Sequence, residues 1–411
     1  MGKNKRQLSI WVIIGSLIIA LSQCTTSDNS AAVKEGEYAL QSTCIKCHKD
    51  ISEMYALSAH FHTSSPVSSE TFKKAVGQNE FHFNDSLKVV VEKRGDDVFQ
   101  VTYLAGKEIA AKRFDVAFGS GEKATTFAYW GEKGLFQLPL THYTKINRWM
   151  NSPGFPSDHP DYKRAIVGGC LECHSSYAQT KTVKSGSLAV REEVVKGSIA
   201  YGIDCQRCHG PAAKHVAFHE GNPEAEGSKY IVKIKNLSRQ QKIDNCAVCH
   251  SGNDQTNQRS TFAFQPGDTL SNYYYPYNTI TAEPDVHGNQ YQMLASSACF
   301  IKSDMDCSSC HNTHKTEKND PVLFSQRCMT CHSASEHPLQ EKLGKAITNN
   351  CIDCHMPIVP SKIISFQESG KLQKASYLLR SHRIAVYGKD VRKVRRYLEK
   401  VFEREREGGN R

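Results

Sequence analysis

The sequence predicts a mainly α-helical and irregular fold, with a small antiparallel β element inserted at about residues 80–140. Three observations lead to this prediction. The motif Cys-x-x-Cys-His occurs seven times in 411 residues, mostly at short intervals. The apolar fraction is 39% and the mean hydropathy is −0.51, so side chains alone would form only a thin core. One stretch without the motif alternates apolar and polar residues, as strands do.

The repeated motif is the attachment signature of c-type haem. Two thiols at this spacing each form a thioether to one vinyl group of a haem, and the adjacent His supplies the proximal iron ligand. A zinc site would need paired Cys-x-x-Cys units and gives no reason for a His after every second Cys. Only about 0.03 copies are expected by chance at this composition. We therefore predict seven covalently attached haems c, at Cys44/Cys47/His48, Cys170/Cys173/His174, Cys205/Cys208/His209, Cys246/Cys249/His250, Cys307/Cys310/His311, Cys328/Cys331/His332 and Cys351/Cys354/His355.

These haems explain the predicted fold class. With roughly 55 residues of chain per haem, the rings would form much of the core, and helices and loops would wrap around them. The intervals after Cys170 leave room for one or two helices per haem and for no independent domain. We expect a first haem segment at 36–79 and a multihaem core with six sites at 141–385.

The β insertion is predicted between the first two motifs, where 121 residues separate His48 from Cys170. Alternating runs begin at Leu87, Val98, Phe114 and Thr126, and glycine-containing turns lie between them. The range 80–140 therefore reads as a small antiparallel sheet. Because haem wrapping does not require it, this sheet is the candidate surface for docking a partner.

The N-terminal residues 1–23 are typical of an export signal. Lys3, Lys5 and Arg6 precede an apolar run from Leu8 to Leu21. The stretch Ala20-Leu-Ser-Gln-Cys24 resembles the cleavage site of bacterial lipoproteins, which would make Cys24 the lipidated first residue; Gln23 departs from that pattern. An ordinary signal peptide and an uncleaved anchor are the alternatives.

The predicted location is therefore outside the cytoplasm, where c-type haem is attached. We expect a periplasmic or outer-membrane lipoprotein of a Gram-negative bacterium, with residues 24–35 as a linker. At the other end, residues 386–411 predict an amphipathic helix, because Val391, Val394, Leu398 and Val401 recur among charged residues.

The formal charge of +10 does not indicate a nucleic-acid partner. Loss of the signal segment would remove three cations, and each haem would add two propionates. No basic run is interleaved with aromatic residues, as nucleic-acid interfaces require. Most Lys and Arg side chains are therefore expected to pair with propionates.

Several motif surroundings resemble the multihaem c-type cytochromes. The segments that carry the resemblance are Cys205-Gln-Arg-Cys-His-Gly-Pro with His215 after it, Cys307-Ser-Ser-Cys-His-Asn-Thr-His314, and Cys351-Ile-Asp-Cys-His-Met-Pro. That superfamily includes the tetrahaem cytochrome of ammonia oxidisers, hydroxylamine oxidoreductase and pentahaem nitrite reductase. The resemblance covers about residues 36–385 and implies closely packed haems. Pentahaem nitrite reductase commonly carries Lys in place of one motif His, and no Cys-x-x-Cys-Lys occurs here.

Eleven His remain outside the motifs, and seven irons need a second axial ligand. His314 follows His311 too closely to reach the opposite face of the same iron, so it would ligate a neighbouring haem. The distal candidates are His60, His215, His287, His314, His337 and His382, while His62, His82, His142 and His219 compete for a seventh position. Cys299 remains as a small buried hydrophobe, with a thiolate ligand as the alternative.

Two functions fit these features. The first is an exported heptahaem cytochrome that carries electrons between a membrane donor, such as a quinol dehydrogenase or another cytochrome, and a periplasmic or extracellular acceptor. The second is an oxidoreductase that acts on a small nitrogen or sulfur compound at one haem with an open distal face. A carrier needs no open iron, whereas an enzyme does. The sequence assigns no catalytic residue, and we expect the carrier.

Overall fold

The computed structural model describes residues 37–68, 79–184, 186, 189–252, 255–275, 284–317 and 320–388. The predicted signal segment, Cys24 and the linker at 24–35 lie outside this part of the chain. The predicted C-terminal helix also falls almost wholly outside it.

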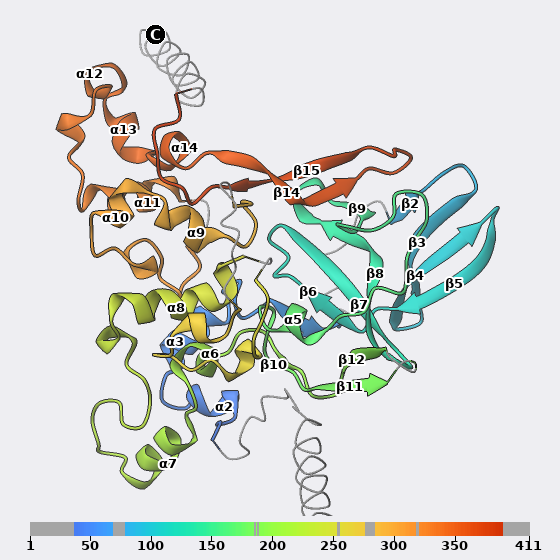
Figure 1. The fold of residues 1–411 in the computed structure, drawn as a ribbon, viewed down its shortest axis with the longest axis horizontal. Coiled ribbons are helices and arrows are strands. Elements are labelled where there is room, and N and C mark those ends of the chain that lie inside the picture. Colours follow the sequence, from blue (N-terminus) through green and yellow to red (C-terminus); the bar gives the residue numbers. More distant parts are fainter. Residues whose placement is uncertain are drawn as a thin grey trace, which may run out of the picture.

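Two antiparallel sheets form one side of the molecule (Figure 1). The smaller is a four-stranded meander of β2 (Glu80–His82), β3 (Leu87–Arg94), β4 (Asp97–Leu104) and β5 (Lys107–Arg113). The larger has the order β1-β6-β7-β8-β9-β14-β15. Its strands are β1 (Ser64–Pro66), β6 (Val116–Phe118), β7 (Ala124–Gly131), β8 (Gly134–Tyr143), β9 (Arg148–Asn151), β14 (Ile358–Gln367) and β15 (Lys374–Arg380).

A shared apolar core holds the two sheets together. On β3, Val89 and Val91 are buried while the residues between and beyond them are less so, because successive side chains of a strand point to opposite faces. These valines join an aromatic cluster with Phe114, Phe127 and Trp149. Buried Gln100 bonds the Leu140 main chain twice, with its amide donating to the carbonyl and its oxygen accepting from the N–H, both at 2.9 Å.

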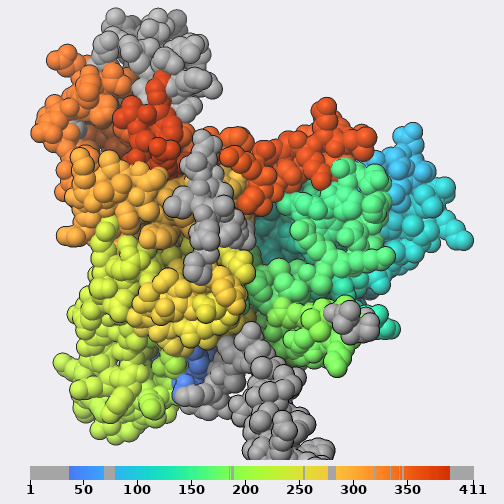
Figure 2. All heavy atoms as spheres, viewed as in Figure 1, coloured from blue at the N-terminus to red at the C-terminus, as the bar shows by residue number. Residues whose placement is uncertain are grey.

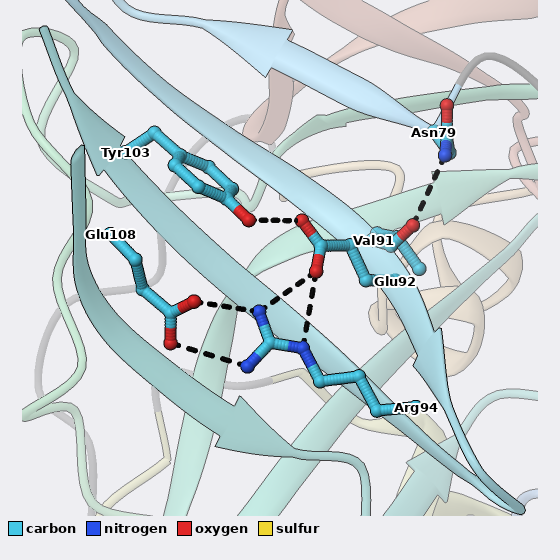
Figure 3. Close-up of polar contacts among 6 residues, drawn as sticks. All are labelled: Asn79, Val91, Glu92, Arg94, Tyr103 and Glu108. Atoms are coloured by element: carbon cyan, nitrogen blue, oxygen red, sulfur yellow. Dashed lines mark hydrogen bonds and ion pairs between the residues drawn. The ribbon is translucent and has the colours of Figure 1, made fainter. Parts of the chain in front are cut away.

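The outer face of the smaller sheet is polar. Arg94 bridges Glu92 and Glu108 at 2.8 Å each, and the Tyr103 hydroxyl donates to Glu92 at 2.6 Å (Figure 3). Such a network of exposed charges adds little stability, but it keeps this face solvated.

The helices are short and lie on the other side of the molecule (Figure 1). Among the described elements only α8 (Arg239–His250) reaches 12 residues, and a capping box of Ser238 and Gln241 begins it. The others are α2 (Gln41–Cys44), α3 (Lys49–Tyr55), α5 (Gly168–Leu171), α6 (Cys205–His209), α7 (Ala213–Gly221), α9 (Gln290–Ala295), α10 (Ala298–Ile301), α11 (Pro321–Met329), α12 (Gln340–Leu343), α13 (Lys345–Asn349) and α14 (Ile352–His355).

Short 3₁₀ turns and two small hairpins complete the elements. The turns are η1 (Thr144–Ile146), η2 (Ile234–Asn236), η3 (Thr261–Ala263), η4 (Leu270–Asn272), η5 (Cys307–Ser309) and η6 (Ala334–Glu336). One two-stranded sheet pairs β10 (Ser175–Tyr177) with β13 (Ala200–Tyr201), and the other pairs β11 (Thr180–Lys184) with β12 (Val190–Val194).

The predicted mainly α fold is wrong. Helices account for 27% and strands for 28%, and a large antiparallel sheet replaces the small inserted element expected at 80–140. The main cause is the C-terminal hairpin β14–β15, which returns to the sheet of the insertion and pairs with β9 through Gln367 and Asn151. This pairing joins residues far apart in sequence, so no local pattern predicts it.

The helical side carries most of the motif segments. In Figure 2 the strands of residues 79–151 occupy the right of the visible face, and residues from about 200 to 356 occupy the left. The β14–β15 hairpin crosses from α14 to the larger sheet, so it ties the last motif to the β side of the molecule.

Candidate haem-binding sites

Each motif lies on one tight helical turn. The N–H of the motif His donates to the carbonyl of the first Cys in four copies, at 2.9 Å in His48, 3.0 Å in His311 and His332, and 3.1 Å in His355. A turn of this kind brings residues three apart onto one face, so both thiols point the same way. Asp204 and Asp306 begin two of these turns by accepting backbone N–H groups at 3.0 and 2.8 Å.

Three of the predicted attachment thiols lie at the surface, which differs from the expectation that the haem sites form the core. Cys47, Cys170 and Cys331 are exposed, whereas the other motif thiols are half-buried. Cys47 is exposed because it lies in the short turn between α2 and α3, where its N–H donates to the Cys44 carbonyl at 3.3 Å. A thioether forms at the edge of the porphyrin, so an exposed thiol can still hold a haem. Cys47 therefore stays a predicted attachment residue, but at an open edge of its site and not in the interior.

Thiols from different motifs touch one another. Cys44 lies against Cys205, Cys173 against Cys249, Cys246 against Cys307, and Cys328 against Cys351. The hydrogen bond from its partner thiol lowers the pKa of Cys44, of Cys249 and of Cys351 below the usual value of a thiol. These contacts join the first motif to the third, the second to the fourth, the fourth to the fifth and the sixth to the seventh.

Two further relations link these pairs into one group. Burial, followed by the charge of Cys249, raises the pKa of Cys208 to about 11, so the third motif adjoins the fourth. Beyond the hydrogen bond with its partner thiol and burial, the charges of Cys310 and Cys299 help to raise the pKa of Cys328, so the sixth motif lies beside the fifth. The motifs therefore follow the path first, third, fourth, fifth, sixth and seventh, and the second branches from the fourth.

Five of the seven motif His face another His, in ring contacts with centroids 6.0–6.3 Å apart. A sixth, His174, has only an electrostatic relation: after burial, the nearby His287 contributes to lowering its pKa. The ring pairs are His48–His215 at 6.3 Å, His60–His250 at 6.1 Å, His209–His314 at 6.0 Å, His311–His382 at 6.2 Å and His337–His355 at 6.3 Å.

This spacing fits two imidazoles on opposite sides of one iron. Metal–imidazole bonds of about 2.0 Å, plus about 1.2 Å from each nitrogen to its ring centre, give centroids roughly 6.4 Å apart. Rings that only packed against each other would be free to lie closer, as His215 and His219 do at 4.7 Å. The residues present therefore fit bis-His haem sites.

Hydrogen bonds fix the tautomer of two of these rings. His215 Nδ1 donates to the Lys229 carbonyl at 2.8 Å, and His355 Nδ1 donates to the Ala385 carbonyl at 3.0 Å. The lone pair is then on Nε2, the nitrogen available to iron. His337 differs, because its Nδ1 lies 3.1 Å from the Leu339 N–H and accepts from it.

Burial keeps several of these rings neutral, which is the form that ligates metal. Desolvation, with a smaller contribution from neighbouring His, lowers the pKa of His60 to about 4 and that of His382 to about 4. Two buried ring nitrogens, His382 Nδ1 and His219 Nε2, have no hydrogen-bond partner among the described residues. Only His382 is paired with a motif His, so the missing bond alone does not identify an iron ligand.

The other spare His lie away from the motif His. His82 lies 3.2 Å from Glu80, and His159 lies 2.7 Å from Asp158. His142 is buried in β8 and bonds Asn147 at 3.1 Å. His62 packs on Phe61, and His219 packs on His215. Across the described ranges none of these five forms a ring pair with a motif His, although four were expected to compete for the seventh distal position.

Two charged residues inside motifs hold the sites together and were not singled out from the sequence. Glu172 is buried and accepts from Asn257 at 2.6 Å, Ser260 at 2.6 Å and Thr261 at 2.9 Å. Arg207 donates to the carbonyls of Thr261 at 2.9 Å and Glu172 at 3.2 Å. The sequence offered one signal for both residues, namely that a charged side chain lies between the two Cys of a motif.

Cys299 lies on α10, between the fourth and fifth motifs in the sequence. It is half-buried, and its charge reaches both Cys310 and Cys328. All fifteen cysteines in the described ranges are free thiols. Within those ranges there is no group of three or more His, Cys, Asp or Glu arranged to hold a bare metal ion.

In the part of the chain that the structure describes, no helix combines the length and apolar character needed to span a bilayer.

The comparisons with known proteins point to one class. No family model matches the chain. It is 24% identical over 202 residues to the multiheme cytochrome MtrA of Shewanella baltica, and 21% identical over 294 residues to the dissimilatory sulfite reductase MccA of Wolinella succinogenes. These matches cover 47% and 59% of this chain but only 54% and 38% of the relatives, so the chain spans about half the length of the first and less of the second.

A solved structure has the same fold. The outer cell wall cytochrome OcwA matches with a TM-score of 0.52 at 15% identity, over 89% of this chain and 86% of that one. Two of the three similar proteins are cytochromes by name, and one of these is multihaem. The comparisons and the repeated Cys-x-x-Cys-His motif thus agree on a multihaem c-type cytochrome as the kind of protein that this chain resembles.

Proposed function

We propose that the protein is an exported heptahaem c-type cytochrome that carries electrons along a row of adjoining haem sites. The observation that carries this proposal is the contact of thiols from different motifs. Each contact places two attachment points side by side, and together they connect all seven. Isolated sites for sensing or for a single reaction need no such continuity.

Each haem, when bound, supplies an iron that accepts and releases one electron. The chain's own residues would hold it through the two motif thiols and the motif His, with the facing His as second ligand. We assign His215 to the first site, His287 to the second, His314 to the third, His60 to the fourth, His382 to the fifth and His337 to the seventh. Two His ligands favour a lower reduction potential than His with Met.

The partners follow from this role. We propose that the donor is a membrane quinol dehydrogenase or another cytochrome, and that a lipid on Cys24 holds the protein near it. A polar-faced sheet of β2 to β5, away from the motif segments, is available for docking. MtrA and OcwA, which the chain resembles, are both named as cytochromes, and this supports the assignment.

The test is a count of haems on the full chain produced with c-haem maturation machinery. A pyridine haemochrome assay should give seven per chain, and three or fewer would defeat the proposal. His215→Ala and His314→Ala should each convert one low-spin haem to high-spin without loss of covalent haem, because the motifs stay intact. His219→Ala is the matched control: it lies beside His215 and outside the ring pairs of the motif His, so the spin states should not change.

The second candidate is reduction or oxidation of a small nitrogen or sulfur compound at one open haem. One observation favours it: among the described residues, His332 of the sixth motif is not one of the paired His. The similarity to a protein named as a sulfite reductase is compatible with it.

A further inference from the structure

We infer that the sixth attachment site, built from Cys328, Cys331 and His332, leaves one axial position of its iron open to a small external ligand. The inference rests on the proposed haem sites and refines them. It assigns a different coordination to this site from the six sites to which a second His is assigned.

The pairing of His side chains supports this assignment by elimination. All eighteen His of the sequence lie within the described residues. Five motif His face a partner ring, and a sixth, His174, has an electrostatic relation to His287. Among the described residues the remaining five His form no ring pair with a motif His: His82 and His142 lie in the sheets, His159 in the loop before α5, His62 just before β1 and His219 on α7. Within the described part of the chain, His332 therefore has no second His to complete its iron.

The nearest spare His in the sequence is committed to another site. His337 follows His332 by only five residues, but its ring faces His355 of the seventh motif at 6.3 Å. The backbone N–H of Leu339 donates to its Nδ1 at 3.1 Å, which holds the ring there and leaves the proton of a neutral ring on Nε2. His337 therefore lies against the seventh motif and not the sixth.

The attachment side of the sixth motif lies at the surface. Cys331, His332 and Ser333 are all exposed. The Ser333 and Ser335 hydroxyls bond each other at 2.7 Å beside them. The motif His of this site is therefore not enclosed by the buried rings that surround several of the other motif His.

Its position in the row makes the open site useful. The Cys328 thiol touches Cys351 of the seventh motif and feels Cys310 of the fifth. Electrons delivered to either neighbouring site would reach the sixth directly. The chemistry that fits is binding of a small molecule with a free lone pair, and one-electron steps would then be supplied from two sides.

The unmodified chain gives the first test, with carbon monoxide and cyanide as probes. EPR of the oxidised protein should show one high-spin haem and six low-spin haems. The reduced protein should bind one equivalent of carbon monoxide per chain, and the oxidised protein one of cyanide. Seven low-spin haems with no ligand bound would overturn the inference, yet the haem count would leave the proposed carrier intact.

Distal variants then locate the open site with every motif untouched. Ala in place of His60, His215, His287, His314, His337 or His382 should raise the carbon monoxide count from one to two in each case. If one of these variants keeps a count of one, that site was already open and the assignment to His332 is wrong.

A pair of motif variants provides a direct check. His332→Ala and His48→Ala both replace an exposed motif His, but His48 faces His215. His332→Ala should remove or alter the native high-spin signal and leave six low-spin haems. His48→Ala should reduce the low-spin count by one and retain the native high-spin signal. The opposite pattern would refute the assignment.

Discussion

Gly202→Ala should disturb the fourth haem site through the backbone. Gly202 has a φ of +68°, and a Cβ there would lie 2.2 Å from the Phe61 carbonyl oxygen and 3.1 Å from its carbon. Both atoms are main chain, so the turn after His60 must move. A hydrogen bond also ties this turn to the residue after Gly202: the Ile203 N–H donates to the His60 carbonyl at 2.9 Å.

The magnitude follows from two costs. An alanine at positive φ costs about 1–2 kcal/mol, and forcing a methyl group into occupied space costs about 1–3 kcal/mol more. Gly197→Ala is the matched control, because its φ is +86° and nothing lies within 4 Å of the added Cβ. It should lose only the first amount.

The assays are guanidinium denaturation followed by far-UV circular dichroism, and EPR of the oxidised protein. Gly202→Ala should have the lower midpoint and a changed low-spin signal from one haem, because His60 is displaced from His250. Gly197→Ala should keep the native signal. Equal midpoints and identical spectra for the two variants would refute the argument that the Phe61 contact positions His60.

Three further changes probe other parts of the molecule. Glu172→Leu should lower the free energy of unfolding by about 3–5 kcal/mol, because three hydrogen-bond donors lose their buried acceptor. Glu172→Gln should lower it by roughly half as much, because the amide oxygen can still accept. Equal losses for the two variants in denaturation curves would contradict this account. The Arg327 side chain lowers the pKa of Glu317 to about 2, so its ion pair stabilises the fold above the unfolded pKa of about 4.3, and that stability is lost as the pH falls toward 2. Glu317→Gln should therefore cost about 1–2 kcal/mol at pH 7 and progressively less below pH 4 in denaturation curves, and a pH-independent loss would count against it. Cys24→Ala should move the protein from the membrane fraction to the soluble fraction, and unchanged membrane association on fractionation would argue against a lipid anchor.

Local sequence was enough to predict the strands whose pattern lies within one segment. The alternating runs from Leu87 and Val98, with the Gly95 turn between them, correspond to β3 (Leu87–Arg94) and β4 (Asp97–Leu104). Adjacent antiparallel strands need only their own side-chain alternation and a short turn. The larger sheet could not be predicted in this way, because β14 joins β9 across more than two hundred residues.

The attachment motifs could be recognised in the sequence because each is complete within five residues. Their order in space was not, since Cys44 meets Cys205 of the third motif and not the second. Nor could spacing show that Cys47 of the same motif lies at the surface, because exposure depends on what the rest of the chain packs against. The same contrast between sequence and folding applies to the second His of each site. His60 and His382 could be chosen as candidates from the number of irons to be satisfied, but only folding sets them against His250 and His311.

By itself, the sequence predicted which residues would bind haem, because covalent attachment depends on local spacing. The tertiary structure alone decided which His face each other and that, within the described ranges, His332 faces none. The physical reason is that two paired His belong to segments that can be any distance apart along the chain. The pairing of distant strands and the burial of distant rings bring such segments together, and neither produces a repeating pattern in the sequence.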